Sequence, residues 1–272
     1  MNSVLEGTAN HVSGVMTQLL NAPLEIREQA GLADAIQNTL VPSVAYRDRR
    51  VEAFGQTIPR DRVGGDLLDL FAAEGEVMAC VADVSGHGLR AAVLMGMLKT
   101  AVRYGLLLGQ PLPALLDGVN RVLPAVKESN MYATLAALRF DGPDEAEYIT
   151  AGHLPLLHYR RRHQDVVRLS VAQFPLGLFE GTGYVSARIR YEPGDIFALV
   201  TDGIVETADG QEAQFGLERL EHILCTLAGD PLSDIFEAAL AAVTRHGTQQ
   251  DDRTLLLVRA LAWEPQQGSR LM

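Results

Sequence analysis

Apolar residues follow two different rhythms along the chain, one typical of buried strands and the other of helices. Largely apolar runs predict strands buried on both faces at residues 77–84, 131–140, 196–201 and 255–260. Apolar residues spaced three and four apart predict long helices at residues 89–108, 112–127, 215–227 and 232–246. Two further apolar runs flank a polar break and predict a hairpin over residues 154–169. The pattern therefore indicates a mixed domain with several fully buried strands.

The first 40 residues have a helical pattern of their own. Apolar residues share one helical face between Val12 and Leu20, and Pro23 then interrupts the pattern. A second periodic run extends from Ile26 and ends before Pro42. These helices either pack on the domain core, or the first of them serves as a dimer or linker helix. We therefore expect a helical segment over residues 1–40, a main domain over 41–263 and a flexible tail over 264–272.

The balance of charges narrows the range of partners. The 272 residues include 34 Asp and Glu against 23 Lys and Arg, which gives a formal net charge of −11. This surplus argues against binding to nucleic acid or to an anionic membrane, because both depend on Lys and Arg. Hydrophobic residues make up 47% of the chain, so it can form a large core and disorder is excluded as its main state.

The sequence also predicts the compartment. The N-terminus lacks the basic start and the apolar stretch of a signal peptide. The most apolar stretch, residues 91–108, contains Lys99 and Arg103 and is too short to span a bilayer. Cys80 and Cys225 are the only cysteines, so we expect neither a disulfide framework nor a zinc cluster. These features predict a soluble protein of the reducing cytoplasm.

Aspartates recur where the predicted strands begin or end. Asp83 closes one strand, Asp202 follows another, and Asp251 and Asp252 precede the last one, while Asp66 follows two glycines. A buried carboxylate is costly unless it is paired or bound to a metal, and no neighbouring basic residue is placed to pair with these groups. Together they could hold hard divalent cations, which prefer oxygen ligands. Any single Asp-Gly step among them is also a common turn.

Other patterns with known chemistry fail on their context. GHGLRA at residues 86–91 matches a dinucleotide-binding loop, but a helix occupies the position where a second strand must end in a ribose-binding acid. No P-loop sequence occurs. Ser85 lacks the glycine two positions earlier that a nucleophile elbow requires, and neither cysteine lies in the setting of a reactive thiol. His87 is either a proton donor or a solvent-facing loop residue.

Five motifs together resemble those of a known enzyme family. They are VGGD at residues 63–66, ADVSGHG at 82–88, AGH at 151–153, TDGIVE at 201–206 and DDRT at 251–254. Their order and spacing resemble the metal-dependent PPM-type (protein phosphatase 2C-like) serine/threonine phosphatases, in particular the stage II sporulation protein E and sigma-factor-regulator branch. The resemblance covers about residues 36–260. It implies an α+β fold, an α-β-β-α sandwich of two antiparallel sheets flanked by helices, here with an N-terminal helical extension.

The resemblance also implies a catalytic centre with two metal ions, Mn²⁺ or Mg²⁺. Asp83 would bridge both ions, and the backbone carbonyl of Val84 would bind one of them. Asp202 and Asp251 would complete the ligands of the first ion. Asp66 would lie at the second ion, either directly or through a water molecule.

The remaining motif positions receive less specific roles from the resemblance. Asp252 would hold the metal-binding residues in place without binding the two main ions, or it would bind a weaker third ion. AGH at residues 151–153 would form a structural turn. Eukaryotic members clamp the phosphate with an arginine that has no secure counterpart here, although Arg60 and Arg62 lie just before the first motif. GDLLD at residues 65–69 replaces the aromatic residues that bacterial relatives often carry, a change expected to affect packing.

The implied reaction is hydrolysis of phosphoserine or phosphothreonine in a protein. Two ions would activate a bridging water and offset the phosphoryl charge, so no covalent phosphoenzyme is needed. In this branch the substrate is usually a phosphorylated anti-sigma-factor antagonist of the STAS type, and the helices over residues 1–40 would receive a regulator or a second copy. The alternatives are an inactive binding or scaffold domain and a phosphatase of small esters. Specificity loops are expected at residues 142–147 and 179–184.

Overall fold

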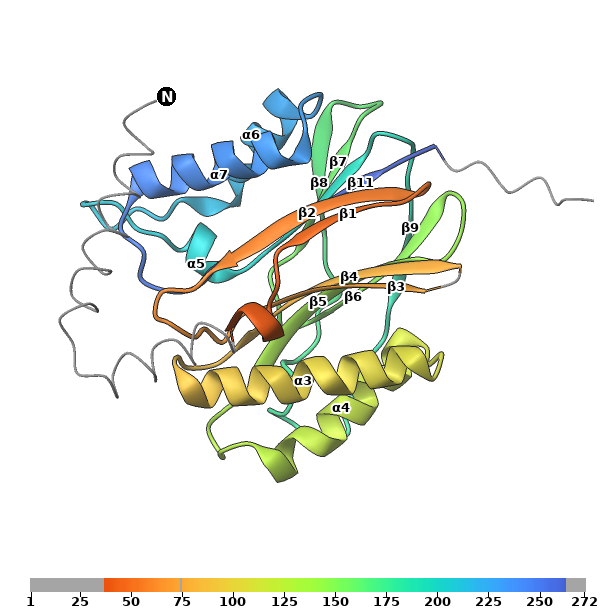
Figure 1. The fold of residues 1–272 in the computed structure, drawn as a ribbon, viewed down its shortest axis with the longest axis vertical. Helices are drawn as coiled ribbons and strands as arrows, with labels where there is room; N and C mark the ends of the chain where they lie inside the picture. The colour runs from red at the N-terminus through yellow and green to blue at the C-terminus, as the bar shows by residue number, and fades with distance from the viewer. Residues whose placement is uncertain (1–36, 74, 263–272) are drawn as a thin grey trace, which may run out of the picture.

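Two antiparallel sheets lie face to face in the computed structural model, which describes residues 37–73 and 75–262 (Figure 1). Sheet A has the order β1-β2-β11-β10-β7-β8, and sheet B has the order β3-β4-β5-β6-β9. The strands of sheet A are β1 (Val44–Arg47), β2 (Val51–Ile58), β7 (Leu156–Arg160), β8 (Asp165–Leu169), β10 (Ile196–Val200) and β11 (Arg253–Ala260). Those of sheet B are β3 (Leu67–Ala73), β4 (Glu76–Val84), β5 (Ala133–Phe140), β6 (Glu145–Ala151) and β9 (Ala187–Arg190).

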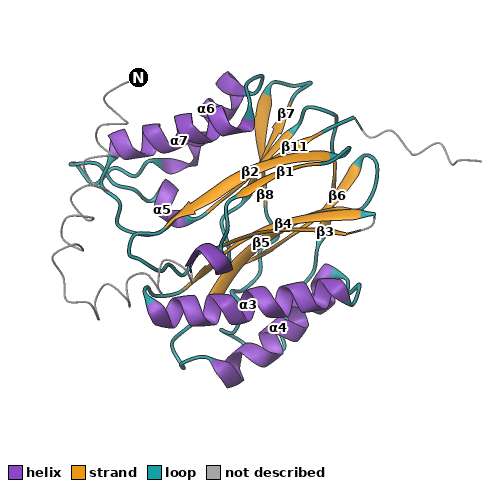
Figure 2. Cartoon of the chain, in the orientation of Figure 1, coloured by secondary structure: helices purple, strands orange, loops and turns teal. Residues whose placement is uncertain are grey.

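Helices cover the outer face of each sheet, as Figures 1 and 2 show. On sheet B lie α3 (Leu89–Leu107) and α4 (Leu112–Val126). On sheet A lie α6 (Gly216–Leu227) and α7 (Leu232–His246). The short helix α5 (Asp202–Val205) follows β10 directly. The expected α-β-β-α sandwich is therefore confirmed.

The alternation of side chains along the strands explains the layers. Phe197 and Leu199 of β10 belong to the core between the sheets, while Ile196 and Ala198 belong to the core beneath α6 and α7. Across the inter-sheet space, the rings of Phe197 and Phe140 meet edge to face with their centroids 5.6 Å apart. A strand that is apolar at every position is thus buried on both faces, as its sequence predicts.

The apolar patterns locate the central elements to within a few residues but miss several outer ones. The predicted strands, the four long helices and the hairpin β7–β8 are all present. Polar residues interrupt strands such as β3 and β6, so these give no continuous apolar run. The loop expected at residues 142–147 is shorter than predicted and lies at the opposite end of the sandwich from Val84. Glu145 begins β6, and β5 carries the chain away from Val84 before that turn.

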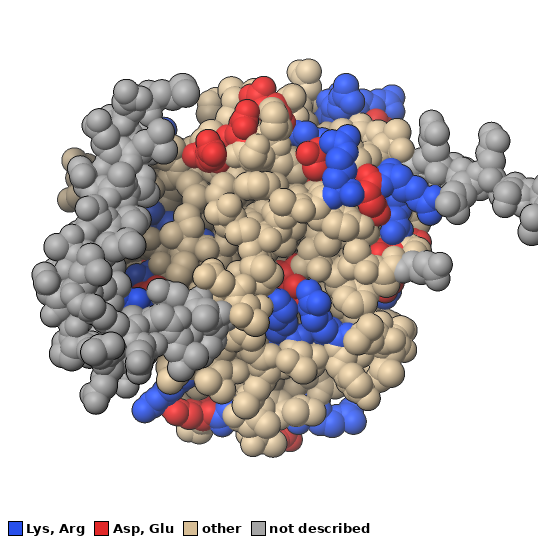
Figure 3. Space-filling view, in the orientation of Figure 1, with Lys and Arg blue, Asp and Glu red and all other residues tan. Residues whose placement is uncertain are grey.

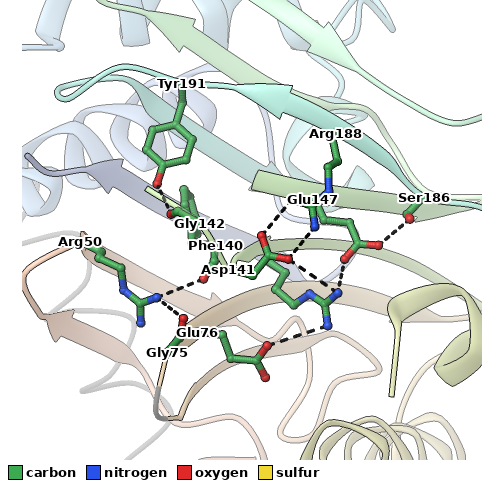
Figure 4. Close-up of polar contacts among 11 residues, drawn as sticks. Arg50, Gly75, Glu76, Phe140, Asp141, Gly142, Glu147, Ser186, Arg188 and Tyr191 are labelled. Carbon is green, nitrogen blue, oxygen red and sulfur yellow. Dashed lines mark hydrogen bonds and ion pairs between the residues drawn. The ribbon is translucent and has the colours of Figure 1, made fainter. Parts of the chain in front are cut away.

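A network of charged groups closes the end of the sandwich that lies farthest from Val84 (Figure 4). The guanidinium of Arg139 on β5 pairs with Glu147 on β6 and lies 3.9 Å from Glu76 on β4. Ser186 donates its hydroxyl hydrogen to the other Glu147 oxygen at 2.5 Å. Arg139 and Glu147 are nearly buried, with side-chain exposures of 14% and 8%. This pair therefore joins the strands of sheet B in a region with little water.

Replacing Arg139 by Met should lower the free energy of unfolding by about 3 kcal/mol, because it leaves the buried Glu147 carboxylate without its cation. The matched control is Arg190→Met, since Arg190 pairs with Glu145 at 3.3 Å but is 82% exposed. That change should cost about 0.5 kcal/mol or less. Urea unfolding of both variants measures the difference, and equal losses would contradict a role for burial.

Part of the sequence analysis concerns residues outside the described ranges. The helices expected over residues 1–40 fall there, apart from a last helical turn at residues 37–40. Their regulatory or dimerisation role therefore stays a prediction, as does the tail over 264–272. Within residues 37–73 and 75–262, no helix is both long enough and apolar enough to cross a membrane. Cys80 is buried as expected, whereas Cys225 is exposed on α6.

Candidate metal centre

The strand-end aspartates lie at one end of the sandwich, where α5 is seen on the left of Figure 1. Asp83 is next to last in β4, and Asp66 immediately precedes β3, whose first residue pairs with Ala82. Asp202 starts α5 just after β10, and Asp251 lies just before β11, whose Leu255 pairs with Val200. Antiparallel pairing therefore places Asp66 near Asp83 at the edge of sheet B, and Asp202 near Asp251 at the edge of sheet A. The face-to-face packing of the sheets then brings these two pairs of aspartates to the same end of the sandwich.

Asp66 joins the two sheets. Its carboxylate is buried and accepts hydrogen bonds from the hydroxyls of Thr201 and Thr254 of sheet A, at 2.8 and 2.5 Å. The Thr201 hydroxyl in turn accepts the backbone N–H of Thr254 at 3.0 Å. Burial and the nearby charge of Asp83 raise the pKa of Asp66 well above its ordinary value. The sequence motifs contain both threonines, but the sequence alone does not reveal that they bind Asp66.

The carboxylate of Asp252 accepts hydrogen bonds from backbone N–H groups. Its Oδ1 accepts the N–H of Arg60 at 2.7 Å, and its Oδ2 accepts the N–H of Gly65 at 2.8 Å. A side chain at Gly64 would place Cβ only 2.2 Å from that Oδ2, so this position must be glycine. Burial raises the pKa of Asp252 despite these bonds. Asp252 thus holds the loop that carries Asp66 against the start of β11.

The remaining aspartates crowd each other electrostatically. Burial, followed by the charges of Asp202, Asp251 and Asp252, raises the pKa of Asp83 to about 7. Burial and the charge of Asp251 likewise raise the pKa of Asp202. Asp251 itself is exposed, and one of its oxygens accepts the N–H of Asp252 at 2.8 Å. Asp83 and Asp202 therefore lie close enough to neighbouring acids for the negative charge to raise their pKa.

No cation compensates this crowding within the described part of the chain. On the face seen in Figure 3, acidic and basic side chains are interspersed. Elsewhere in the described chain, acids pair with bases, as Glu218 does with Arg168 at 2.7 Å. Among residues 37–73 and 75–262, by contrast, none of the ion pairs involves the four predicted catalytic aspartates, Asp66, Asp83, Asp202 and Asp251. Positive charge must come from outside these residues to stabilise the ionised acids.

The set of groups fits a hard divalent cation. All the candidate donors are oxygens, and glycines let backbone and carboxylate atoms approach closely: a Cβ at Gly65 would lie 2.8 Å from the carbonyl oxygen of Val84. A Cβ at Gly203 would lie 2.0 Å from the carbonyl oxygen of Asp252, so the glycine after Asp202 serves close packing. No three acidic, His or Cys side chains of the described residues are already gathered tightly enough to hold an ion.

A comparison with known families identifies the chain. The profile of the family described as Stage II sporulation protein E (SpoIIE) matches residues 73–261, well over half of the chain. The chain belongs to the SpoIIE family. The match includes every predicted ligand except Asp66, which precedes it.

Individual relatives agree with this assignment. The phosphoserine phosphatase RsbU of Bacillus subtilis (strain 168) is 24% identical over 239 residues, which cover 86% of this chain and 71% of RsbU. The crystal structure of the RsbU and RsbW domains of Rv1364c from Mycobacterium tuberculosis has a TM-score of 0.74 at 26% identity, covering 83% of this chain and 64% of that one. RsbX in complex with magnesium has a TM-score of 0.63 at 17% identity, covering 80% of this chain and 99% of RsbX. The chain is thus a SpoIIE-type phosphatase domain, and it spans less than two thirds of the Rv1364c structure.

The other residues in or near the sequence motifs differ in exposure and in the contacts that they make. The side chain of His87 is 73% exposed, which agrees with a solvent-facing loop residue. Arg60 is exposed beside the acids and donates its Nη1 hydrogen to the carbonyl of Gln250 at 2.7 Å. Gly152 of the AGH motif has a φ of 63°, its Cβ would lie 2.4 Å from Pro175, and it forms an isolated bridge with Leu135, so the expected turn stays a prediction. His153 makes two hydrogen bonds that the sequence did not indicate.

Proposed function

We propose that the protein is a divalent-metal-dependent phosphatase of phosphoserine and phosphothreonine in proteins. The observation that carries this proposal is the placement of Asp66, Asp83, Asp202 and Asp251, drawn from both sheets, at one end of the sandwich. Burial and neighbouring acids raise the pKa of Asp66, Asp83 and Asp202 there. The described residues offer them no ion pair, so bound Mn²⁺ or Mg²⁺ would supply the missing charge. The complex of RsbX with magnesium supports the choice of a hard cation.

In this proposal each acid has a separate task. Asp83 and the carbonyl of Val84 would hold the ions from sheet B, and Asp202 and Asp251 would hold them from sheet A. Asp66 fixes the spacing between the sheets through its threonine partners and is a candidate ligand, directly or through water. When bound, a pair of divalent ions supplies an activated water and neutralises charge on the phosphoryl group. Asp252 holds the ligand loop, or binds a weaker third ion.

The substrate we favour is a phosphorylated STAS-domain antagonist of an anti-sigma factor. RsbU is named as a phosphoserine phosphatase, and Rv1364c joins an RsbU domain to an RsbW domain. Both names support a place in sigma-factor signalling. A small phosphate ester could use the same ions, and an inactive scaffold is the remaining alternative. The retained aspartates argue against the inactive scaffold, because a degenerate relative should have lost ligands.

Phosphate release tests the proposal directly. The wild-type protein should hydrolyse an aryl phosphate and a phosphoserine STAS-domain protein only with Mn²⁺ or Mg²⁺, and Asp202→Asn should remove both activities. The matched control is Asp209→Asn, since Asp209 also precedes a glycine but is bonded to the backbone N–H groups of Gln211 and Ala213. Equal rates for wild type and Asp202→Asn would reject the assignment. Activity on the aryl phosphate alone would favour the small-ester alternative.

A further inference from the structure

His153 lies between the two sheets at the metal-centre end and contacts both. Its Nδ1 is 2.7 Å from the hydroxyl oxygen of Thr134, on β5 of sheet B. Its Nε2 is 3.1 Å from the carbonyl oxygen of Val200, the last residue of β10 in sheet A. The backbone just before it is fixed, because the N–H of Gly152 donates to the carbonyl of Gln173 at 3.0 Å. The imidazole therefore connects two strands that have no backbone pairing with each other.

The two contacts define the protonation of the ring. A carbonyl oxygen can only accept a hydrogen bond, so Nε2 must carry the hydrogen that it donates to Val200. Burial lowers the pKa of His153 to about 4, so the ring is neutral near pH 7 and Nδ1 is unprotonated. Nδ1 then accepts the hydroxyl hydrogen of Thr134. Both ring nitrogens are occupied by protein groups, which leaves neither free to donate a proton to a leaving group.

Both partners of His153 stand next to predicted ligands. Thr134 lies directly opposite Asp83 in the pairing of β4 with β5, so the two side chains are neighbours on one face of sheet B. Val200 is followed by Thr201, which binds Asp66, and then by Asp202. The imidazole thus spans from the strand position beside Asp83 to the strand end that leads into Asp202.

We propose that His153 is a positioning residue that sets the distance between the sheet B and sheet A ligands of the metal centre. The proposal rests on the proposed function, because it assumes that Asp83 and Asp202 bind the same pair of ions. Asp66 and its threonines form one polar connection between the sheets, and His153 forms a second. With two connections, the sheets can neither separate nor slide at the end where the ligands must converge.

Calorimetric titration of Mn²⁺ into the whole protein tests this role without relying on turnover. His153→Phe keeps a ring but removes both hydrogen bonds, and it should weaken Mn²⁺ binding about 10- to 100-fold, as loss of a ligand's supporting partner usually does. His153→Gln keeps a donor that reaches Val200 and should recover most of the affinity. Thr134→Val removes the other contact at constant shape and should weaken binding in the same direction. Thr134→Val decides the question if His153→Phe does not fold.

The matched control is His158→Gln, which alters a fully buried histidine. Nε2 of His158 lies 2.8 Å from Asp195 of sheet A, and its ring stacks on Phe197. Its loss should destabilise the fold but leave Mn²⁺ affinity unchanged. Unchanged affinity in both His153→Phe and Thr134→Val, or an equal loss in His158→Gln, would overturn the positioning role. If the wild-type protein itself binds no Mn²⁺, the proposed function fails instead.

Discussion

Asp83→Asn should reduce phosphate release in saturating Mn²⁺ by at least about 100-fold, while making the metal-free protein more stable than wild type. The two effects have one cause. Asp83 is half-buried beside Asp202 and Asp251, so its charge is costly without a metal and useful with one. An amide keeps the size of the side chain but removes the charge. Loss of activity joined to a gain in stability is difficult to explain by general damage to the fold.

Phosphate release and thermal unfolding in EDTA measure the two effects on the same preparation. Glu76→Gln is the matched control, because Glu76 begins the strand in which Asp83 is next to last, and it lies 3.9 Å from Arg139. That variant should retain activity and lose a little stability. A variant Asp83→Asn that turns over normally, or one that is less stable than wild type in EDTA, would argue against Asp83 as a metal ligand.

The sequence predicts the central strands because a strand buried on both faces is apolar at nearly every position. β10 and β4 are apolar on both faces, and such a run can only lie inside a layered domain. The outer strands have a less distinctive pattern of apolar and polar residues. β9, with the pattern ARIR, alternates between half-buried and exposed residues at the edge of sheet B, so its sequence resembles an ordinary loop.

The aspartates of the candidate site could be named from the sequence, but their supporting groups could not. Each aspartate stands in a local motif, and the family resemblance orders these motifs. The threonine partners of Asp66 lie 135 and 188 residues away, and the partners of His153 lie 19 and 47 residues away on two different sheets. Such contacts depend on how the two sheets face each other. A local pattern carries no information about that packing, so the AGH motif by itself predicts only a turn.

The pH dependence of stability should reverse when Mn²⁺ is added. In the metal-free protein the pKa of Asp83 is raised from 3.8 to about 7, so the folded state binds this proton more tightly than the unfolded chain does. Stability is then highest below pH 4 with respect to this group, and it falls as the pH rises through the window from about 4 to about 7. The full effect is about 4 kcal/mol, or about 10 °C in Tm for a domain of this size.

Subtracting a variant isolates this effect from the other titrating groups. His153 acts in the opposite direction, because its pKa is lowered to about 4 and its contribution to stability is lost as the pH falls from 6.5. Unfolding of wild type and Asp83→Asn in EDTA between pH 5 and pH 8 should therefore give Tm values that diverge as the pH rises, with wild type the lower. Saturating Mn²⁺ should raise the wild-type Tm most at pH 8, because the ion binds only the folded state and requires the ionised acids. Parallel curves for the two proteins in EDTA would mean that Asp83 has the same pKa in the folded protein as in the unfolded chain. Repulsion between the acids would then contribute nothing to the affinity of this end of the sandwich for metal.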